Sequence, residues 1–264
     1  MVCLDEGGCG RRHLRLIAPP ASLAPWVEHL WIQEDHGNAL GQPWRIVADF
    51  CGHLVFSHGL QHRVRCAVVG SRAIYEDIDV SRRKITAGAR LRLGALAPLT
   101  RSHAGAFADR AFRVDDVFGQ AGRALADRMS NATPMAAIAH LVAFLEEQLS
   151  SREPDFQLER AFEAAHSVAW LARSLNVSLR AVQTRTAESV GLSPRRVLRI
   201  LRLHRALHHA STADSAWAET ACIAGFADQS HMVREFRSLL GDSPTGWRNR
   251  AGTDSFNTSA LSTR

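Results

Sequence analysis

The spacing of hydrophobic residues changes near the middle of the chain. Between Trp44 and Leu96, apolar residues occur in short alternating or β-branched runs separated by glycine and polar turns, which is typical of strands. These runs are Trp44–Ala48, Leu54–Phe56, Arg63–Val69 and Arg90–Leu93. From residue 119 the spacing becomes helical, over 119–129 and 134–149, and Thr133-Pro134 supplies a cap and first-turn signal. The front half is predicted to be a small antiparallel sheet or barrel followed by helices.

The last hundred or so residues carry a repeat. Gly191-Leu192-Ser193-Pro194 and Gly241-Asp242-Ser243-Pro244 each combine a glycine that can close a helix, a serine that can cap the next one and a proline suited to its first position. Upstream, three pairs of positions correspond: Ala172 with Ala221, Asn176 with Gly225, and Ser178 with Asp228. This pattern predicts two helix-turn-helix units. An αα-hairpin of an ordinary helical bundle is the alternative for either unit alone.

The helix of the second unit has one apolar stripe, formed by Met232, Phe236 and Leu239, which we expect to be buried. Its other faces carry Gln229, Ser230, His231, Val233, Arg234 and Arg237. In the first unit, Leu179, Val182 and Val190 are expected to face inward, whereas Arg180, Gln183 and Thr184 share the opposite side. Arginine suits guanine and glutamine suits adenine in a major groove, although both are also ordinary solvated helix residues.

Between the two units lies a basic segment, Arg195 to Leu207, with no acidic residue. Its arginines are Arg195, Arg196, Arg199, Arg202 and Arg205, and Val197, Ile200 and Leu201 form a separate apolar stripe. A long helix of this kind would hold the units apart and place guanidinium groups beside phosphates. A solvated basic face is the alternative.

The stretch from Ala221 to Arg248, with Gly225-Phe226-Ala227-Asp228-Gln229-Ser230-His231 and Gly241-Asp242-Ser243-Pro244, resembles the signature of AraC/XylS transcription regulators. The resemblance implies two helix-turn-helix units on a linking helix, each placing one recognition helix in a successive major groove. It implies base contacts from Arg180, Gln183, Thr184, Gln229, Ser230, His231 and Arg234. We further predict phosphate contacts from Ser178, Arg185, Arg195, Arg196, Arg199 and Arg237.

The first unit departs from the family pattern at three positions. Thr184 stands where an arginine is usual, Thr186 where a buried phenylalanine is usual, and Asn176 where a glycine is usual. Asparagine tolerates the left-handed region, so the last change is mild.

Segments 25–31, 49–56 and 112–119 resemble the N-terminal domain of one branch of AraC-type regulators. That resemblance implies a domain that senses an effector or mediates dimers. Trp26, Trp31 and Trp44 are candidates for lining an effector pocket, or else they belong to the core.

Composition adds a net charge of +6, which favours a polyanionic partner or an acidic membrane surface. No apolar run is long enough to span a bilayer, the N-terminal residues lack the apolar core of a signal peptide, and five scattered cysteines fit a reducing compartment. We therefore expect a cytoplasmic protein with no membrane partner.

No catalytic motif is found in the sequence: a phosphate-binding glycine loop, a Gly-x-Ser-x-Gly elbow and a His-Glu-x-x-His pair are all absent, so we predict no enzyme and no cofactor. We expect three histidines at the solvent-exposed surface of the basic helix: His204, His208 and His209. We predict no metal ion. A metal site stays an open alternative at one set of thiols and imidazoles, although the spacing of these residues fits no zinc pattern. That set is Cys51, His53, His58, His62 and Cys66.

The predicted fold class is α+β, with a β-rich and then helical N-terminal domain over 1–150, a linker over 151–158, an all-α DNA-binding domain over 159–250 and a disordered tail over 251–264. The predicted function is sequence-specific regulation of transcription on double-stranded DNA, modulated by a small-molecule effector or a homodimer, with RNA polymerase as a further partner. The alternatives are a nonspecific architectural DNA binder and a cupin-like metal enzyme fused to a DNA-binding module.

Overall fold

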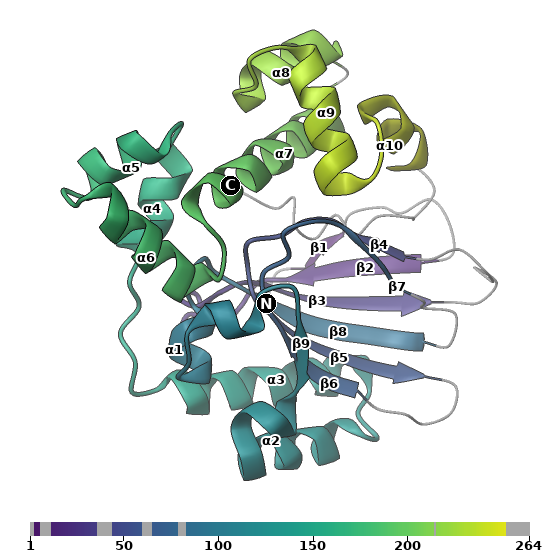
Figure 1. Cartoon of the computed structure of the whole chain (residues 1–264). Helices are drawn as coiled ribbons and strands as arrows, with labels where there is room; N and C mark the ends of the chain where they lie inside the picture. Colours follow the sequence, from purple (N-terminus) through teal and green to yellow (C-terminus); the bar gives the residue numbers. More distant parts are fainter. Residues whose placement is uncertain are drawn as a thin grey trace.

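The structure is a computed structural model that describes residues 3–5, 12–35, 44–59, 65–78, 83–213 and 215–251. Its fold class is α+β, as predicted. Antiparallel strands occupy the N-terminal part, and helices form the rest of the described chain (Figure 1). The disordered tail was predicted over 251–264, but Ala251 is the last residue of helix α10. The rest of that segment, 252–264, and His62 lie outside the described residues.

A seven-stranded sheet with the order β1-β2-β3-β8-β5-β6-β9 forms the centre of the N-terminal part, and every described pair is antiparallel. Its strands are β1 (Cys3–Asp5), β2 (Arg12–Ile17), β3 (Val27–Asp35), β5 (His53–Gly59), β6 (Arg65–Val69), β8 (Arg83–Leu91) and β9 (Ala111–Arg113). A separate ribbon pairs β4 (Trp44–Ile46) with β7 (Glu76–Ile78). The sequence indicated strands only between Trp44 and Leu96, so β1, β2, β3 and β9 were missed.

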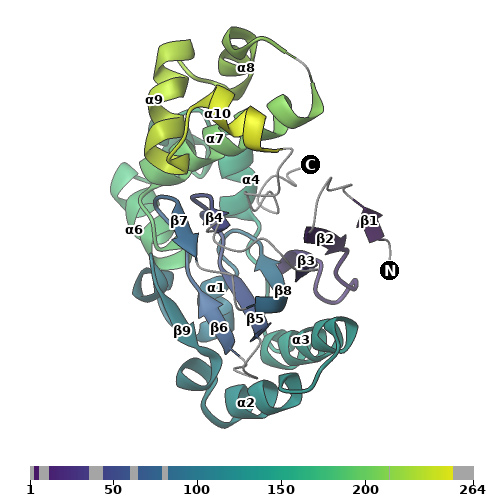
Figure 2. The same cartoon turned by 90° about the vertical axis from the view of Figure 1, so that its right-hand side faces the viewer.

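Two helices, α2 (Val114–Met129) and α3 (Pro134–Leu149), cover one face of this sheet (Figures 1 and 2). Thr133 caps α3 by accepting a hydrogen bond from the amide of Ala136, as predicted. A hydrophobic cluster fills the layer between them, where Leu30 and Leu54 of the sheet meet Leu141 and Phe144 of α3.

The remaining helices are α1 (Leu96–Thr100), η1 (Ala104–Phe107), α4 (Gln157–Ala164), α5 (Val168–Ser174), α6 (Leu179–Val190), α7 (Pro194–Thr212), α8 (Trp217–Ala224), α9 (Gln229–Leu240) and α10 (Pro244–Ala251). α4 begins inside the segment that was predicted to be a linker. The helices from α4 to α10 share a second hydrophobic cluster with N-terminal residues, among them Val47, Ala48 and Phe50. The two parts of the chain therefore share this second cluster.

Candidate nucleic-acid interface

Two helix-turn-helix units, α5–α6 and α8–α9, stand at either end of the long helix α7 (Figure 1). The repeated tetrapeptides adopt the predicted geometry. Gly191 and Gly241 close α6 and α9 in the left-handed conformation, with φ of 84° and 71°. Ser193 accepts from the amide of Arg196, and Ser243 accepts from the amide of Gly246. The prediction of two helix endings followed by two capped starts is confirmed.

The turns inside the two units also correspond. Asn176 and Gly225 have φ of 52° and 82°, and the next residue of each turn donates its amide to the equivalent alanine carbonyl. Val177 N–H bonds to Ala172 O at 3.0 Å, and Phe226 N–H bonds to Ala221 O at 2.9 Å. Ala227 is then an extra residue in the second turn. It explains why Ala172 and Ala221, before the turn, are 49 residues apart, whereas Ser178 and Asp228, after it, are 50 apart.

In the second unit the predicted apolar stripe is buried, with Met232, Phe236 and Leu239 at most 1% exposed. Asp228 caps α9 by accepting from the amide of His231. Gln229, Ser230, Arg234 and Arg237 are exposed, so four of the predicted contact residues lie on the free surface of α9.

His231, also predicted to contact a base, is half-buried against the turn. Its ring packs edge-on against Phe226 with 5.5 Å between centroids, and its Nδ1 accepts from the amide of Ala227 at 3.4 Å. Its Nε2 lies 3.9 Å from Glu235. These contacts fix the ring orientation at the start of α9.

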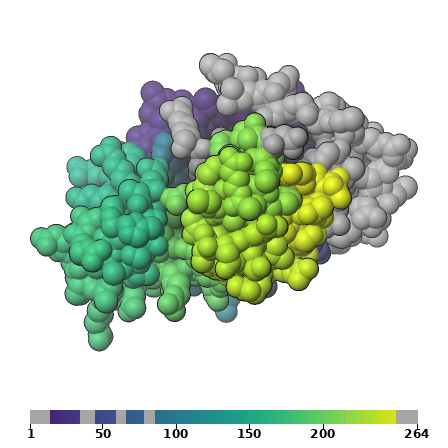
Figure 3. Space-filling model, turned by 90° about the horizontal axis from the view of Figure 1, so that it is seen from above, coloured from purple at the N-terminus to yellow at the C-terminus, as the bar shows by residue number. Residues whose placement is uncertain are grey.

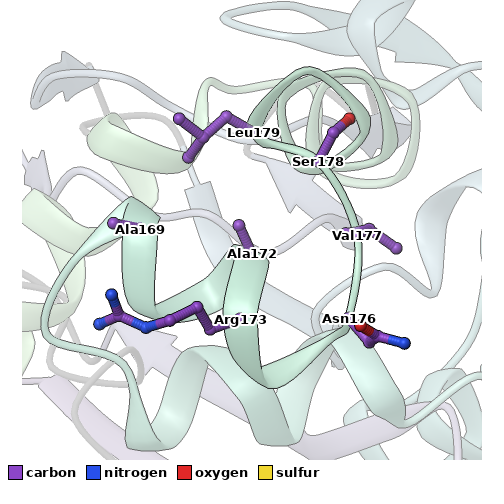
Figure 4. A pocket seen from close by; sticks show the side chains of 7 residues that line it. All are labelled: Ala169, Ala172, Arg173, Asn176, Val177, Ser178 and Leu179. Carbon is purple, nitrogen blue, oxygen red and sulfur yellow. The ribbon is translucent and has the colours of Figure 1, made fainter.

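The first unit differs from expectation at one position. Val182 and Val190 are buried, but Leu179 is 52% exposed, so the prediction that it faces inward is wrong. The reason is that the facing residues of α5 are Ala169 and Ala172, whose short side chains leave a hollow beside Leu179 (Figure 4).

The predicted base-contacting residues of this unit, Arg180, Gln183 and Thr184, are all exposed, as is the cap Ser178. Thr186 is fully buried, and its hydroxyl donates to Val182 O at 2.7 Å. The residue that replaces the usual phenylalanine thus occupies a core position and satisfies its polar group within the helix.

The arginines of α7 do not form one uniform basic face. Arg195 and Arg196 are exposed at the start of the helix. Arg199 bonds to Glu235 at 2.8 Å and to Ser238 at 3.3 Å, both on α9. Arg202 lies over the Phe226 ring, and burial lowers its pKa. Glu235 therefore supplies the negative charge that the α7 sequence itself lacks.

Three further basic or ionisable groups are held by partners. Arg205 donates to the Glu163 carbonyl, and Arg185 is ion-paired with Asp155. His204 is fully buried, with its Nε2 2.8 Å from the Ala48 carbonyl oxygen, so its prediction at the wet surface is wrong. His204 lies on the side of α7 that packs against the N-terminal part, a partner that helical spacing alone could not identify.

Both recognition helices are anchored to the N-terminal part at their C-terminal ends. A Cβ added at Gly191 would lie 2.7 Å from the Ala104 carbonyl oxygen, and one at Gly241 would lie 2.5 Å from the Tyr75 ring. Arg45 donates to the Gly241 carbonyl at 3.0 Å. The N-terminal ends of α6 and α9 carry the exposed polar residues. Figure 3 shows the two units beside each other on one side of the molecule.

A buried polar cluster joins the sheet to these helices. Arg90 is fully buried and binds Asp49 through two hydrogen bonds of 3.0 and 2.8 Å, and it also pairs with Glu28. His53 lies 2.9 Å from the same Asp49 carboxylate. The cluster sits beside Phe50, whose ring lies 5.5 Å from that of His204.

The candidate metal set is not assembled among the described residues, where no group of three or more His, Cys, Asp or Glu side chains could hold an ion. Cys51 and Cys66 are buried free thiols, and burial raises the pKa of Cys66 to about 12. His53 is engaged with Asp49.

The three candidate tryptophans lie in different surroundings. Trp26 packs in the cluster between the sheet and α3, and Trp31 is buried but belongs to the opposite face of β3 from Leu30 and Ile32. Trp44 lies in β4, and its side chain is outside the described part of the structure.

No helix within the described ranges has the length and apolar character needed to cross a bilayer.

Residues 171–250 match the helix-turn-helix domain family, and residues 15–113 match a domain of unknown function, DUF6597. The HTH-type transcriptional activator RhaS of Escherichia fergusonii is 32% identical over 111 residues, which cover 41% of this chain and 34% of RhaS. The matched region thus spans about a third of the length of that curated relative.

Solved structures of ToxT from Vibrio cholerae are also similar. One shares 9% identity and covers 79% of this chain and 96% of ToxT, with a TM-score of 0.40. Another, bound to (E)-4-(8-methylnaphthalen-1-yl)but-3-enoic acid, shares 11% identity and covers 80% of this chain and 96% of ToxT, with a TM-score of 0.42. At these scores the likeness carries no argument. The helix-turn-helix match over residues 171–250 agrees with the duplicated turns and caps observed there, and this region of the chain is similar to a transcriptional activator of the HTH type.

Proposed function

We propose that this protein regulates transcription by binding a specific duplex DNA sequence through α6 and α9. The observation that carries the proposal is the polarity of the two helices: each is anchored at its C-terminal end and exposes hydrogen-bonding side chains at its N-terminal end. The N-terminal residues of a recognition helix are those that contact base edges in helix-turn-helix proteins. Base contacts come from Arg180, Gln183 and Thr184 on α6 and from Gln229, Ser230, His231 and Arg234 on α9.

Phosphate contacts come from the exposed groups that flank these helices: Ser178, Arg195, Arg196 and Arg237. Arg185 can join them by exchanging Asp155 for a phosphate. Arg199 was also predicted to bind phosphate, but two of its nitrogens hold α9 through Glu235 and Ser238. We therefore assign Arg199 mainly to positioning the second recognition helix against α7.

The experiment is a binding-site selection with the full chain and random duplexes, followed by affinities at several salt concentrations. A regulator prefers its selected site over random duplex by at least about a thousandfold at physiological salt. Arg234→Ala should relax preference at one base pair and cost about 1 to 3 kcal/mol, whereas Arg195→Ala should weaken all sequences and reduce the salt slope by about 1. The exposed Arg123 on α2 supplies a matched control, because Arg123→Ala removes a charge away from the proposed surface.

A flat selection profile would favour the architectural DNA binder instead. Identical behaviour of Arg234→Ala and Arg195→Ala would contradict the division between base and phosphate contacts.

We assign the binding of a regulatory effector to the face of the sheet opposite α3. The strand register places His29, Trp31, Gly88, Arg90 and Ser57 on that face. Both ring nitrogens of His29 and the indole nitrogen of Trp31 are buried without a hydrogen-bond partner among the described residues. Because buried polar groups are normally satisfied, this face is suited to a small polar molecule that would supply the missing partners.

A thermal-shift screen of small metabolites tests whether an effector binds, because a ligand that binds the folded state raises the apparent melting temperature of the protein. A hit that binds through Trp31 should lose its shift in Trp31→Phe and keep it in Trp170→Phe, which alters a tryptophan of α5. Regulation through a homodimer and contact with RNA polymerase stay predictions.

A further inference from the structure

The start of α6 carries two exposed hydrophobic side chains. Leu179 is 52% exposed and Val177 is 37% exposed, and they flank the capping residue Ser178. Large hydrophobic side chains elsewhere in the described residues are mostly buried, and only Ile74, Met135 and Ile223 share this degree of exposure. An adjacent exposed pair is therefore a local exception, and such patches mark binding sites more often than scattered single residues do.

The pair borders a hollow of about 500 Å³ between α5 and the start of α6 (Figure 4). Its floor is apolar, because Ala169 and Ala172 of α5 line it. Arg173, on the same helix, lines the hollow as well. Figure 4 shows the Leu179 side chain extending from the start of α6 over the side of α5 that carries Ala169.

The surroundings favour nucleic acid over an apolar protein partner. Leu179 is the first residue of α6, directly before Arg180 and one helical turn before Gln183, and both of these are exposed. Arg173, which lines the hollow, and Arg180, which follows Leu179 in the chain, supply positive charge that suits a polyanion. In the major groove, the group that an apolar side chain contacts is the C5-methyl of thymine.

The second unit supplies the contrast. Gln229 is the first residue of α9 and is the equivalent of Leu179, because both follow the capping residue. The residue equivalent to Val177 is Phe226, which is 6% exposed and packed on His231. The second unit therefore offers a hydrogen-bonding group where the first offers an apolar one.

We propose that Leu179, backed by Val177, is a specificity-determining residue that packs on the C5-methyl group of a thymine in the groove faced by α6. The inference rests on the proposed function, since it requires that α6 enter a major groove. It goes beyond that function by naming the base and the atom that the first unit recognises without a hydrogen bond.

The test uses the duplex obtained by binding-site selection with the full chain. Each thymine in the half-site assigned to α6 is replaced singly by deoxyuridine, which removes only the methyl group. At one position the wild-type protein should lose affinity roughly fourfold, the factor expected for one buried methyl or methylene group. Leu179→Ala should bind the thymine duplex more weakly and should no longer distinguish thymine from deoxyuridine at that position.

Gln229→Ala is the matched control. It alters the equivalent residue of the second unit, so it should retain the wild-type difference between thymine and deoxyuridine in the α6 half-site. Because Leu179 is exposed, Leu179→Ala should leave the melting temperature of the free protein unchanged, which separates a lost contact from a lost fold.

Equal binding of all deoxyuridine duplexes by the wild-type protein would overturn the inference, as would a thymine preference that survives in Leu179→Ala. If Leu179→Ala bound every duplex like the wild type, the exposed pair would be assigned to a protein partner instead. Failure to select any duplex is a different result, because it removes the proposed function together with this inference.

Discussion

Arg90 is the residue on which the two parts of the chain depend most directly. It belongs to the central strand β8, is fully buried, and bonds to Asp49 in the segment that packs on α7. A guanidinium in this position must be paired, since an isolated buried charge is strongly unfavourable. Glu28 and His53 complete the surroundings of the pair.

We predict that Asp49→Asn lowers the free energy of unfolding by about 3 to 5 kcal/mol, because it leaves Arg90 buried without its main counter-charge. Asp77→Asn is the control: Asp77 pairs with Arg45 near the surface, and removal of such a pair costs at most about 1 kcal/mol. Urea denaturation of the three proteins measures both values. Equal losses in the two variants would show that the buried pair has no special role.

His29 links stability to pH. Its pKa is lowered from 6.5 to about 4, chiefly by burial and also by the nearby His53, while Asp49 opposes the shift. Between these values the unfolded chain binds a proton that the folded chain does not. Stability contributed by neutral His29 is therefore present above pH 6.5 and is lost as pH falls toward 4. His204, whose pKa burial also lowers, acts in the same direction.

We predict that the free energy of unfolding falls on acidification by up to about 1.4 kcal/mol per pH unit for each such histidine inside this window. His29→Gln keeps a polar side chain but cannot titrate, so its stability should decline less steeply between about pH 7 and pH 5. Urea denaturation at several pH values gives the two slopes. Parallel slopes for the wild type and His29→Gln would assign the dependence to other groups.

At the scale of the element, the helix endings test how the recognition helices are anchored. Gly241 and Gly225 both have positive φ, 71° and 82°. They differ in what lies beside them: a Cβ at Gly241 would lie 2.5 Å from Tyr75, whereas the nearest atom at Gly225 would be 3.8 Å away on Arg202. Alanine at either position bears the same conformational penalty, so any difference measures the contact with the N-terminal part.

We predict that Gly225→Ala costs about 1 to 2 kcal/mol, the penalty of placing a Cβ in the left-handed region. Gly241→Ala should cost about 1 to 3 kcal/mol more, because the added methyl group meets the packed Tyr75 ring. Denaturant unfolding gives the two values, and Tyr75→Ala in the Gly241→Ala background should recover part of the difference. Equal costs for the two glycine variants would mean that the α9 ending is not anchored on Tyr75.

These elements also show what sequence can predict. The turns at Gly191 and Gly241 and the caps Ser178 and Asp228 were predictable, because each depends on residues within one helical turn. Leu179, Arg199 and His204 were not, because their environment is set by Ala169, Glu235 and Ala48, which lie on other elements. A helical stripe indicates that a face is buried or exposed but does not identify the facing element.

The sheet shows the same limit. Strands near Leu54 and Val68 were evident from β-branched and apolar runs, whereas β3 was not, because it mixes Glu28, His29 and Gln33 with apolar residues. Those polar residues are accommodated by pairing with β8, where Arg90 lies opposite His29. The shared hydrophobic cluster was equally hidden, since Val47, Ala48 and Phe50 are not part of any regular strand face that contacts the helices.

For the whole molecule, the shared core makes the two parts of the chain a single mechanical unit. Phe50 packs in the cluster with Leu203 and Leu207 of α7, and its ring faces both His204 and Arg90. An N-terminal segment thereby supports the helix that separates α6 from α9. A change in the sheet that moves this segment would displace residues that pack on α7.

We therefore predict one cooperative unfolding transition by scanning calorimetry, with the calorimetric and van't Hoff enthalpies in agreement. Phe50→Ala should lower stability by about 3 to 5 kcal/mol and shift that single transition as a whole, because both parts lose the same contact. Phe118→Ala alters the α2–α3 layer, away from α7, and tests whether the N-terminal part unfolds together with the C-terminal helices. It should shift the same transition rather than one half of it. Two transitions, of which each variant moves only one, would show that the sheet and the helices from α4 to α10 fold independently despite their shared cluster.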